Sequence, residues 1–569
     1  MPYLLSLPIC LGLVVNLAFE APGPQQPQPT LRVFADLEHT GILAGPLTSA
    51  APDPKHFGIA VPLPVRRPGR DRGPETLAAE DRMVKRLGRL RVETTNAADE
   101  VVVLLESEAR HSLRLYRNSD GAWRRLASRD DLSWTLSPGK DGALEIGVGV
   151  LLPEARAGGE QTVWPRAFTV VISTKAQQGE LLRVPFRVAP FIIPSALEPV
   201  DELMIVSEPV TADSVDAVAA FAARTSLKLV AYEVDENCDQ WMQDTIEPGV
   251  FTFPTEVDIR QARASLTGLR KGASPLAASL DNRVTGWLRR QGVVTVVPGT
   301  SRKKTRWTDG YGNVEATPPH TDRKGRRFPF GRIIIGKQRE LTMHSGVLSF
   351  LEAQGVQWPP IVVDTSWLTV GHVDEVVNFV PAKTKAGFKV LLPSPKAARE
   401  SMQALLANGL EEAPVFEGTD NEMTLSDLQM TIAETPENLA IDGAVARVRE
   451  QLKRELKLED SDFVMLPALF HKGMAVIPNA VNSVVVNGHL LVPEPLGPRR
   501  NNSDEFEQAI RAALAECDVR VVFIDSWNAY HTSAGGIHCG TNTVRRLRDP
   551  AWWKHTGNAD PGANRSASH

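Results

Sequence analysis

The chain has 569 residues, a net charge of −5 and four cysteines, with 42% hydrophobic, 23% charged and 6% aromatic residues. This composition is typical of globular proteins and argues against a fully disordered, collagen-like or multi-span membrane chain. A dedicated nucleic-acid-binding protein would be strongly basic, so no nucleic-acid partner is expected. Four cysteines cannot form a disulfide scaffold in a chain of this size. At about 150 residues per domain, the length predicts three or four domains.

Residues 1–19 form an apolar run with no Lys or Arg before it. The run is shorter than the roughly 20 residues of a membrane span, so no stable span is predicted. It has the apolar core of a signal peptide but lacks the basic start and a good cleavage site. A secreted or periplasmic location and a cytoplasmic location therefore both stay open. Residues 21–30 (APGPQQPQPT) are rich in Pro and Gln and predict a linker, so residues 1–30 are set apart from the folded chain.

Residues 31–194 are predicted to form an all-β region. Short β-branched runs, such as residues 100–105 (EVVVLL) and 169–172 (TVVI), are separated by turn-forming stretches such as residues 137–142 (SPGKDG). This spacing predicts one or two β-sandwiches. Because no metal-binding or nucleophile spacing occurs there, the region is expected to be a structural or binding module.

Residues 195–555 alternate between strand and helix patterns and predict an α/β region of the size of a catalytic domain. Residues 204–206 and 227–230 predict strands, and between them Val215, Val218 and Ala222 lie on one face of a helix. The same pattern recurs near the end, where Phe506, Ile510 and Leu514 precede a strand at residues 521–524. Residues 556–569 form a polar tail.

Three short segments of the α/β region carry the residues suited to chemistry. They are residues 239–247 (DQWMQDTIE), 371–375 (GHVDE) and 536–542 (GIHCGTN). If the second segment is extended, His372 and Asp374 point to the same side. In the third, small residues flank Cys539 and are expected to leave its Sγ accessible.

Together the segments supply a nucleophile, an acid/base and two carboxylates. A thiolate with a histidine suits acyl transfer, but two carboxylates in one pocket fit a neutral amide poorly. They fit a guanidinium, which is planar, permanently charged and has five N–H donors in a fork. Asp244 and Asp374 could each accept two of those donors and align the central carbon for attack, with Trp241 stacking on the cation or its stem.

These residues resemble the protein-arginine deiminases, which are guanidino-group hydrolases of the pentein fold. The likeness covers roughly residues 200–555, and its motifs are long, correctly ordered and compatibly spaced. They are the DxWxQDxxExG segment at 239–249, YGNVE at 311–315 with Pro318, Pro319 and GRI at 331–333, VGHVDE at 370–375, Gly387-Phe388 with Ser394-Pro395, Pro478-Asn479, and HCGTN at 538–542.

The resemblance implies a five-bladed α/β pentein (α/β propeller) after an all-β, immunoglobulin-like sandwich region. It implies hydrolysis of the arginine guanidinium in proteins or peptides to citrulline and ammonia, through a covalent amidino-thioether on Cys539. His372 would be the general acid/base, and Asp244 and Asp374 would bind the guanidinium. Two further residues, Trp241 and Val370, would line the slot for the arginine stem.

The resemblance also implies a calcium ion held by hard oxygen donors, which suit Ca²⁺. The donors would be the side chains of Gln243, Glu247 and Glu315 and the backbone carbonyls of Tyr311 and Val314. A second calcium site of the family uses an acid directly after the catalytic aspartate, but here that position is Thr245, which leaves the second site open.

One further departure concerns the substrate peptide. The family has an arginine six residues before the cysteine that holds the peptide backbone, and this chain has Ser533. Arg270 is the candidate for a compensating basic contact. His538, next to the nucleophile, is interpreted as structural, and Cys238 and Cys517 as buried thiols.

Two alternative functions stay open at this stage. One is a deiminase or amidinotransferase for a small guanidino compound, and the other is a non-catalytic calcium-binding protein on the same scaffold. The presence of all four catalytic residue types argues against the second alternative.

Overall fold

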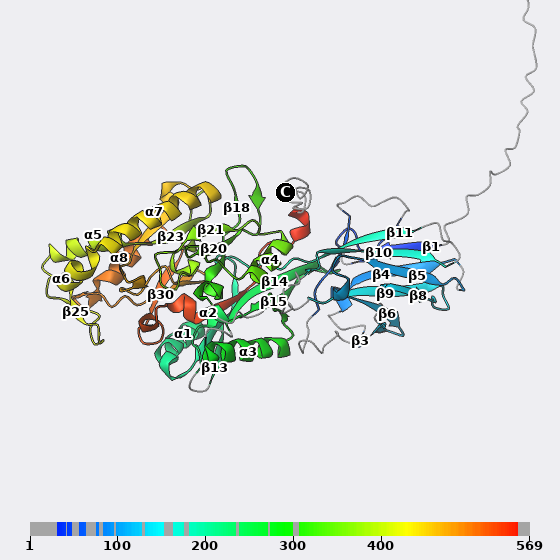
Figure 1. Cartoon of the computed structure of the whole chain (residues 1–569), viewed down its shortest axis with the longest axis horizontal. Coiled ribbons are helices and arrows are strands. Elements are labelled where there is room, and N and C mark those ends of the chain that lie inside the picture. Colours follow the sequence, from blue (N-terminus) through cyan, green and yellow to red (C-terminus); the bar gives the residue numbers. More distant parts are fainter. Residues whose placement is uncertain are drawn as a thin grey trace, which may run out of the picture.

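The computed structural model describes residues 31–40, 42–47, 56–63, 76–78, 84–95, 98–127, 131–152, 163–175, 181–234, 238–270, 274–299 and 306–555. The apolar run at 1–19, the linker at 21–30 and the tail at 556–569 therefore lie outside the described residues. The protein is elongated, with an all-β region at one end and an α/β region at the other (Figure 1). None of the helices described is both long and apolar enough to cross a membrane.

The all-β region has two sheets that share one hydrophobic cluster and so form a single sandwich. The runs predicted at residues 100–105 and 169–172 are confirmed as strands β5 and β10. In β5, Val101, Val103 and Leu105 are buried and the residues between them are more exposed, as expected when one face of a strand packs on a core.

The strand order of the first sheet is β1 (Leu31–Ala35), β4 (Gly88–Thr94), β9 (Ala143–Val150), β6 (Leu113–Ser119), β7 (Ala122–Arg125), β3 (Thr76–Ala78). The order of the second is β2 (Gly58–Ala60), β11 (Leu182–Val188), β10 (Ala167–Thr174), β5 (Val101–Glu106), β8 (Ser133–Leu136).

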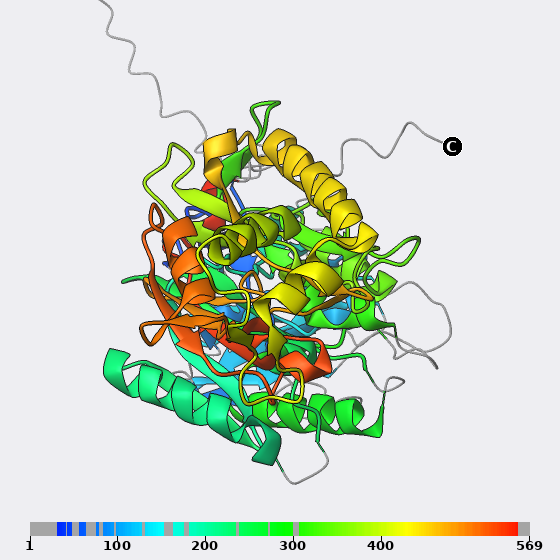
Figure 2. The same cartoon turned by 90° about the vertical axis from the view of Figure 1, so that its left-hand side faces the viewer.

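The α/β region contains five three-stranded sheets of one topology, here called units one to five. In each unit the central strand pairs antiparallel with one neighbour and parallel with the other. At least one helix connects the parallel pair, because parallel strands need a crossover connection. Seen along the long axis, helices lie around the outside, with α1 and α3 along the lower edge and α7 along the upper edge (Figure 2).

Each unit runs from the antiparallel strand through the central strand and helix to the parallel strand. Unit one is β34 (Thr541–Arg545), β12 (Val200–Ser207), α1 (Ala212–Thr225), β13 (Lys228–Glu233). Unit two is β14 (Ile246–Pro254), β15 (Ile259–Thr267), α3 (Pro275–Arg290), β16 (Val294–Val296). Unit three is β17 (Val314–Ala316), β20 (Ile333–Lys337), α4 (Ser345–Gln354), β21 (Ile361–Asp364). Unit four is β22 (Asn378–Pro381), β23 (Phe388–Ser394), α5 (Pro395–Leu406), α7 (Pro436–Leu456), β26 (Phe463–Pro467). Unit five is β29 (Val484–Val486), β30 (His489–Pro493), α8 (Glu505–Ala513), β33 (Arg520–Ile524).

The helices and strands predicted at the two ends of this region are confirmed. Helix α1 buries Val218 and Ala222 on the expected face, and strands β12 and β13 lie on either side of it in sequence. Helix α8 buries Phe506 and Ile510 and precedes β33. The hydrophobic spacing was sufficient here because each helix has a single packed face.

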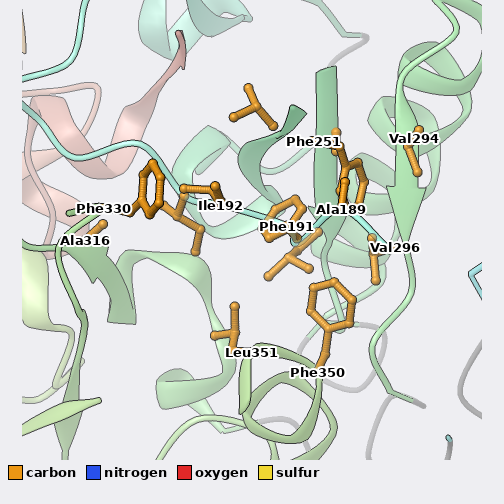
Figure 3. Close-up of a cluster of buried hydrophobic side chains, with 14 of the residues drawn as sticks. Ala189, Phe191, Ile192, Phe251, Val294, Val296, Ala316, Phe330, Phe350 and Leu351 are labelled. Atoms are coloured by element: carbon orange, nitrogen blue, oxygen red, sulfur yellow. The ribbon is translucent and has the colours of Figure 1, made fainter. Parts of the chain in front are cut away.

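A hydrophobic cluster joins the sandwich to the α/β region. Phe191 lies between the two regions in sequence, is 1% exposed, and packs edge-on against Phe251 (ring centroids 5.8 Å apart) and Phe350 (5.5 Å). Figure 3 shows these three rings at the centre of the cluster. The buried Gln357 side chain accepts from the Ile193 backbone N–H and donates to the Ile193 carbonyl, both at 2.9 Å, so the connecting segment is fixed by polar contacts as well.

Truncation of Phe191 should destabilise the protein strongly. We expect Phe191→Ala to lower the free energy of unfolding by about 3–5 kcal/mol, because a buried ring is replaced by a cavity. Urea denaturation followed by fluorescence and circular dichroism measures this change. Val257→Ala, at a residue that is 82% exposed, serves as the control and should shift stability by no more than about 0.5 kcal/mol. Equal effects of the two substitutions would contradict the assignment of this cluster as the joint between the regions.

Candidate active site

Five short segments meet at one place, and each follows the last strand of one unit. The site is therefore assembled from all five junctions of the α/β region. In unit order the segments are α2 (Met242–Thr245), the 3₁₀ turn η5 (Tyr311–Asn313), the 3₁₀ turn η6 (Val373–Glu375), the loop residue Asn482, and α9 (Ile537–Gly540).

The α2 segment presents Asp244. Met242 and Thr245 are buried and anchor the single helical turn, and the Thr245 hydroxyl donates to the Trp241 carbonyl at 2.8 Å. Asp244 keeps a little exposure. Its Oδ1 accepts from the Gly312 backbone N–H at 3.1 Å and lies 3.5 Å from His372 Nδ1.

The η6 segment presents His372 and Asp374. The extended conformation considered for residues 371–375 does not continue beyond His372, because residues 373–375 form a 3₁₀ turn. The Glu375 side chain accepts from the His372 backbone N–H at 3.1 Å and caps that turn. Both His372 and Asp374 are buried, and both still reach the same place.

The glycine at position 312 marks that place. A Cβ atom there would lie 2.6 Å from His372 Nδ1, 3.0 Å from Asp374 Oδ2 and 3.2 Å from Asp244 Oδ1. No side chain larger than hydrogen fits among these three groups without displacing them. The absence of a side chain therefore keeps the three groups close together.

Cys539 joins the same cluster from α9. Its Sγ lies 3.4 Å from Asp374 Oδ2 and 3.1 Å from Asn482 Nδ2, and Asn482 Oδ1 also accepts from the Cys539 backbone N–H at 3.2 Å. The expectation that small neighbours leave the thiol accessible is wrong, because Cys539 is only 7% exposed. The small residue after it serves packing instead: a Cβ at Gly540 would lie 2.1 Å from the buried Tyr530 ring.

The charges of the site shift the pKa values of the two reactive groups upward. Burial alone lowers the pKa of the His372 imidazole, but the carboxylates of Asp244, Asp374 and Glu375 outweigh burial, so the pKa is raised. The ring has an acceptor at each nitrogen, since Nε2 lies 2.7 Å from the Trp307 carbonyl. This arrangement suits the protonated imidazolium, in which both nitrogens are donors.

The raised pKa favours the charged form of His372 but the neutral form of the Cys539 thiol. Burial raises the pKa of Cys539 well above its ordinary value, and the carboxylates of Asp374, Glu375 and Asp244 raise it further. Burial also raises the pKa of Glu375, to about 8. Without a bound cation, the site therefore favours a protonated thiol beside a protonated imidazole.

Of the two residues predicted to line the arginine slot, Trp241 lies close to the thiol. Its ring packs against Tyr530, and a Cβ at Gly535 would touch both the Trp241 ring (2.5 Å) and the Cys539 Cβ (3.4 Å). Val370 is half-buried and precedes Gly371 and His372 in the chain.

The prediction that Arg270 contacts a substrate peptide is wrong. The side chain is 5% exposed, and its guanidinium is enclosed by acidic and hydroxyl groups. It donates to Asp281 (2.8 and 3.1 Å), to Asp239 (2.8 Å) and to the Thr245 hydroxyl (2.6 Å), and it lies 3.9 Å from Asp244 Oδ2. Arg270 thus supports the α2 segment from behind.

The predicted calcium ligands lie on the other side of α2. Gln243, Glu247 and Glu315 line one cavity together with His538 and Arg545. The Gln243 amide donates to Glu247 Oε2 at 3.1 Å and to the Tyr311 carbonyl at 3.5 Å, so a neutral N–H donor lies between two of the expected oxygen ligands. Val314, the remaining predicted ligand, begins β17 directly after η5.

Nearby positive charge does not fully offset the burial of the two carboxylates in this cavity, so the pKa of each is raised. Burial raises the pKa of Glu247 well above its ordinary value, with the neighbouring Glu315 adding to the shift, and burial raises the pKa of Glu315 to about 7. Two buried carboxylates beside an amide and a carbonyl oxygen fit a hard dication. Within the described part of the chain, no group of three or more His, Cys, Asp or Glu side chains is arranged to hold a metal.

Sequence reasoning missed three parts of the site. Asn482 contacts the nucleophile but lies four residues beyond the Pro478 that the motif comparison used. His538 was set aside as structural, yet its Nδ1 lies 2.9 Å from Asp374 Oδ2. The Trp307 carbonyl, which orients His372, is a backbone group that no residue pattern identifies.

Comparisons with known proteins identify the family of the chain. The model of the family described as "Protein-arginine deiminase (PAD)" matches residues 182–554. The chain is 35% identical over 391 residues to protein-arginine deiminase type-4 of Rattus norvegicus and 33% identical over 396 residues to type-3 of Homo sapiens. Each alignment covers 65% of this chain and 56% of the relative, so the chain spans little more than half the length of these relatives.

Among solved structures, an agmatine deiminase of Enterococcus faecalis matches with a TM-score of 0.37 and 12% identity, over 63% of this chain and 97% of that one. The family match covers well over half of the chain and includes all five junction segments. The chain belongs to the protein-arginine deiminase family.

Proposed function

We propose that this protein hydrolyses the guanidinium group of arginine in proteins or peptides to citrulline and ammonia. The observation that carries the proposal is the convergence of Asp244, His372 and Asp374 around Gly312, with Cys539 in contact with Asp374. Membership of the family supports the same activity, since the relatives that match are protein-arginine deiminases.

We also propose that the five units close into the five-bladed pentein propeller and that the sandwich is of the immunoglobulin-like type. Closure is supported by β34, which follows unit five in sequence but pairs with β12 of unit one. The junction segments of all five units then point toward one centre, which is where the proposed chemistry takes place.

Binding of the guanidinium is supported by an unsatisfied acceptor. Asp374 is buried, and its Oδ1 has no hydrogen-bond partner within the described structure. An unpaired buried carboxylate oxygen is costly, so a ligand with several N–H donors gains from filling the position. Asp374 and Asp244 would accept from the guanidinium on two sides, and Trp241 would pack against its stem.

Catalysis would proceed in two displacements. With the substrate bound, the Cys539 thiol would lose its proton to solvent, and the thiolate would attack the guanidinium carbon. The C–N bond breaks as His372 Nδ1 gives its proton to the departing nitrogen, which leaves as ammonia. A water molecule then loses a proton to His372 and attacks the same carbon. The C–S bond breaks, citrulline forms and the thiol is restored.

The positive charge of the substrate would activate the thiol. The same carboxylates that raise the pKa of Cys539 would be paired by the bound guanidinium, and a nearby cation favours the thiolate. The nucleophile is then formed mainly when an arginine side chain is in place, which limits reaction with neutral electrophiles.

Calcium is the proposed cofactor. Gln243, Glu247 and Glu315, with the carbonyls of Tyr311 and Val314, would hold the ion on the side of α2 away from Arg270. When bound, the ion supplies positive charge that offsets the two buried carboxylates. Since Gln243 and Glu247 lie on either side of Asp244 in sequence, these ligands would also fix the position of the guanidinium-binding carboxylate.

The substrate class is tested by citrulline formation. We expect citrulline from a blocked peptidyl-arginine in the presence of calcium, with Cys539→Ala abolishing it. His372→Asn should slow the reaction roughly 10²–10⁴-fold, because a positioned acid/base is lost. Cys517→Ala, at a buried thiol outside the site, is the control and should retain activity. Citrulline production by Cys539→Ala would contradict the mechanism.

Faster turnover of free arginine or agmatine than of the peptide would favour a small guanidino substrate. Such a substrate would not need the peptide-holding arginine of the family, and this chain has the exposed Ser533 at that position.

The raised pKa of the thiol predicts a specific pH dependence. In the unliganded protein, alkylation of Cys539 by neutral iodoacetamide should rise with pH through a midpoint above about 8.5, the value of a free cysteine. Mass spectrometry of the Cys539 peptide measures the rate separately from Cys238 and Cys517. A haloacetamidine carries a guanidinium-like charge. At neutral pH it should alkylate Cys539 at least about tenfold faster than expected from its rate with free cysteine. A midpoint at or below 8.5 for iodoacetamide would contradict the proposed electrostatics.

Calcium dependence is a separate prediction. Excess chelator should abolish citrulline formation and added Ca²⁺ should restore it. Glu247→Gln and Glu315→Gln should each raise the Ca²⁺ concentration that gives half-maximal activity by at least about tenfold, since each removes one carboxylate ligand. Glu256→Gln, at an exposed acid in the β14–β15 turn, is the matched control. Undiminished activity in excess chelator would remove the metal from the mechanism.

A further inference from the structure

One side chain next to the nucleophile has no role in the mechanism above. His538 belongs to α9, and its ring is largely buried between two carboxylates. Its Nδ1 lies 2.9 Å from Asp374 Oδ2, and its Nε2 lies 3.3 Å from Glu315 Oε1. The first carboxylate belongs to the catalytic cluster, and the second belongs to the predicted calcium ligands.

These contacts form part of a continuous chain of polar groups. Asp374 Oδ2, which faces His538, also lies 3.4 Å from Cys539 Sγ. At the other end, Glu315 shares its cavity with Gln243, Glu247 and His538 itself. The imidazole ring is rigid, so it cannot keep both contacts when one carboxylate moves.

The backbone limits the freedom of the ring further. The His538 N–H donates to the Asn482 carbonyl at 3.2 Å, while the Asn482 side chain contacts the sulfur and backbone of Cys539. A movement of His538 is therefore transmitted to the residue that carries the nucleophile. In contrast, Asp374 Oδ1 stays without a partner, so Oδ2 is the oxygen that His538 holds.

We propose that His538 is a positioning residue that couples the occupancy of the calcium site to the orientation of Asp374. This inference rests on the proposed function. In the arrangement described here, His538 occupies Asp374 Oδ2, an oxygen that faces the place of the guanidinium. If Glu315 served as a ligand of a bound calcium ion, Nε2 would lose its partner, and the ring would be free to turn and to leave Oδ2 to the substrate.

The proposal predicts reciprocal coupling of two ligands. Calcium should tighten the binding of a guanidinium, and the guanidinium should tighten the binding of calcium by the same factor. Isothermal titration calorimetry on Cys539→Ala, which prevents turnover, measures both dissociation constants with agmatine and Ca²⁺ as the probes. We expect calcium to tighten agmatine binding at least about fivefold in this parent.

Two substitutions separate the contacts of the ring. His538→Asn keeps a donor near the position of Nδ1, toward Asp374, and loses the contact with Glu315. His538→Gln keeps a donor near the position of Nε2, toward Glu315, and loses the contact with Asp374. In the Cys539→Ala background, each should reduce the coupling factor to within about twofold of one, because either contact alone cannot transmit the change. His471→Gln, at an exposed histidine of the β27 hairpin strand (Phe470–His471), should leave it unchanged.

The outcomes distinguish this proposal from the proposed function. Coupling that persists in both variants, with native circular dichroism, would overturn the role of His538. Calcium-dependent citrulline formation without coupling in the Cys539→Ala parent would overturn this proposal alone. Absence of citrulline from the protein with Cys539 intact would overturn the proposed function, and absence of calcium binding would overturn both the metal site and the role of His538.

Discussion

The structure depends on negative charge buried where the units of the α/β region meet. Asp239 and Asp281 lie behind α2, Asp374 lies in front of it, and Glu247 and Glu315 lie to one side. Buried carboxylates are stable only when a positive group or hydrogen-bond donors face them. Each group of carboxylates in this site therefore needs a positive group or hydrogen-bond donors beside it.

The positive partners differ from one side of α2 to the other. Behind α2 the partner is permanent, because Arg270 cannot lose its proton and its donors already bind Asp239 and Asp281. In front, His372 supplies a proton that chemistry can use. On the third side, the partners of Glu247 and Glu315 among the described residues are the Gln243 amide, His538 and the more distant Arg545. The side with the weakest compensation is the one proposed for calcium, and the unpaired Asp374 oxygen is the position proposed for substrate.

The sequence predicted most of the fold and four of the side chains that converge, but not the contacts of Asn482 and His538 with them. This was feasible because each of the three segments carries its functional residues within a few positions, and because hydrophobic spacing identifies helices with one packed face. The short turns were harder. Residues 373–375 follow no long hydrophobic period, so the 3₁₀ turn that brings His372 and Asp374 together was not expected.

The errors about burial and about the roles of side chains share a physical cause, since each concerns contacts with residues outside the local sequence motif. Cys539 contacts Asn482, which comes from another loop, and the next residue, Gly540, packs against Tyr530, nine residues before Cys539. The position of Arg270 is decided by Asp281 on α3, and the role of His538 is decided by Glu315 on β17. The residues next to Arg270 or His538 in the sequence do not reveal which partners these side chains meet in the fold.

The pairing of β34 with β12 also bears on how the proposed active site forms during synthesis. Ile205 pairs with Thr541, only two residues after Cys539, so the strand next to Cys539 is synthesised after all the other strands of the five units. Contacts between such distant residues are slow to form because a long loop must close first. The thiol is therefore held in its reactive surroundings only after the whole α/β region has been made and its two ends have joined, and earlier nascent chains carry the carboxylates of the site without its nucleophile.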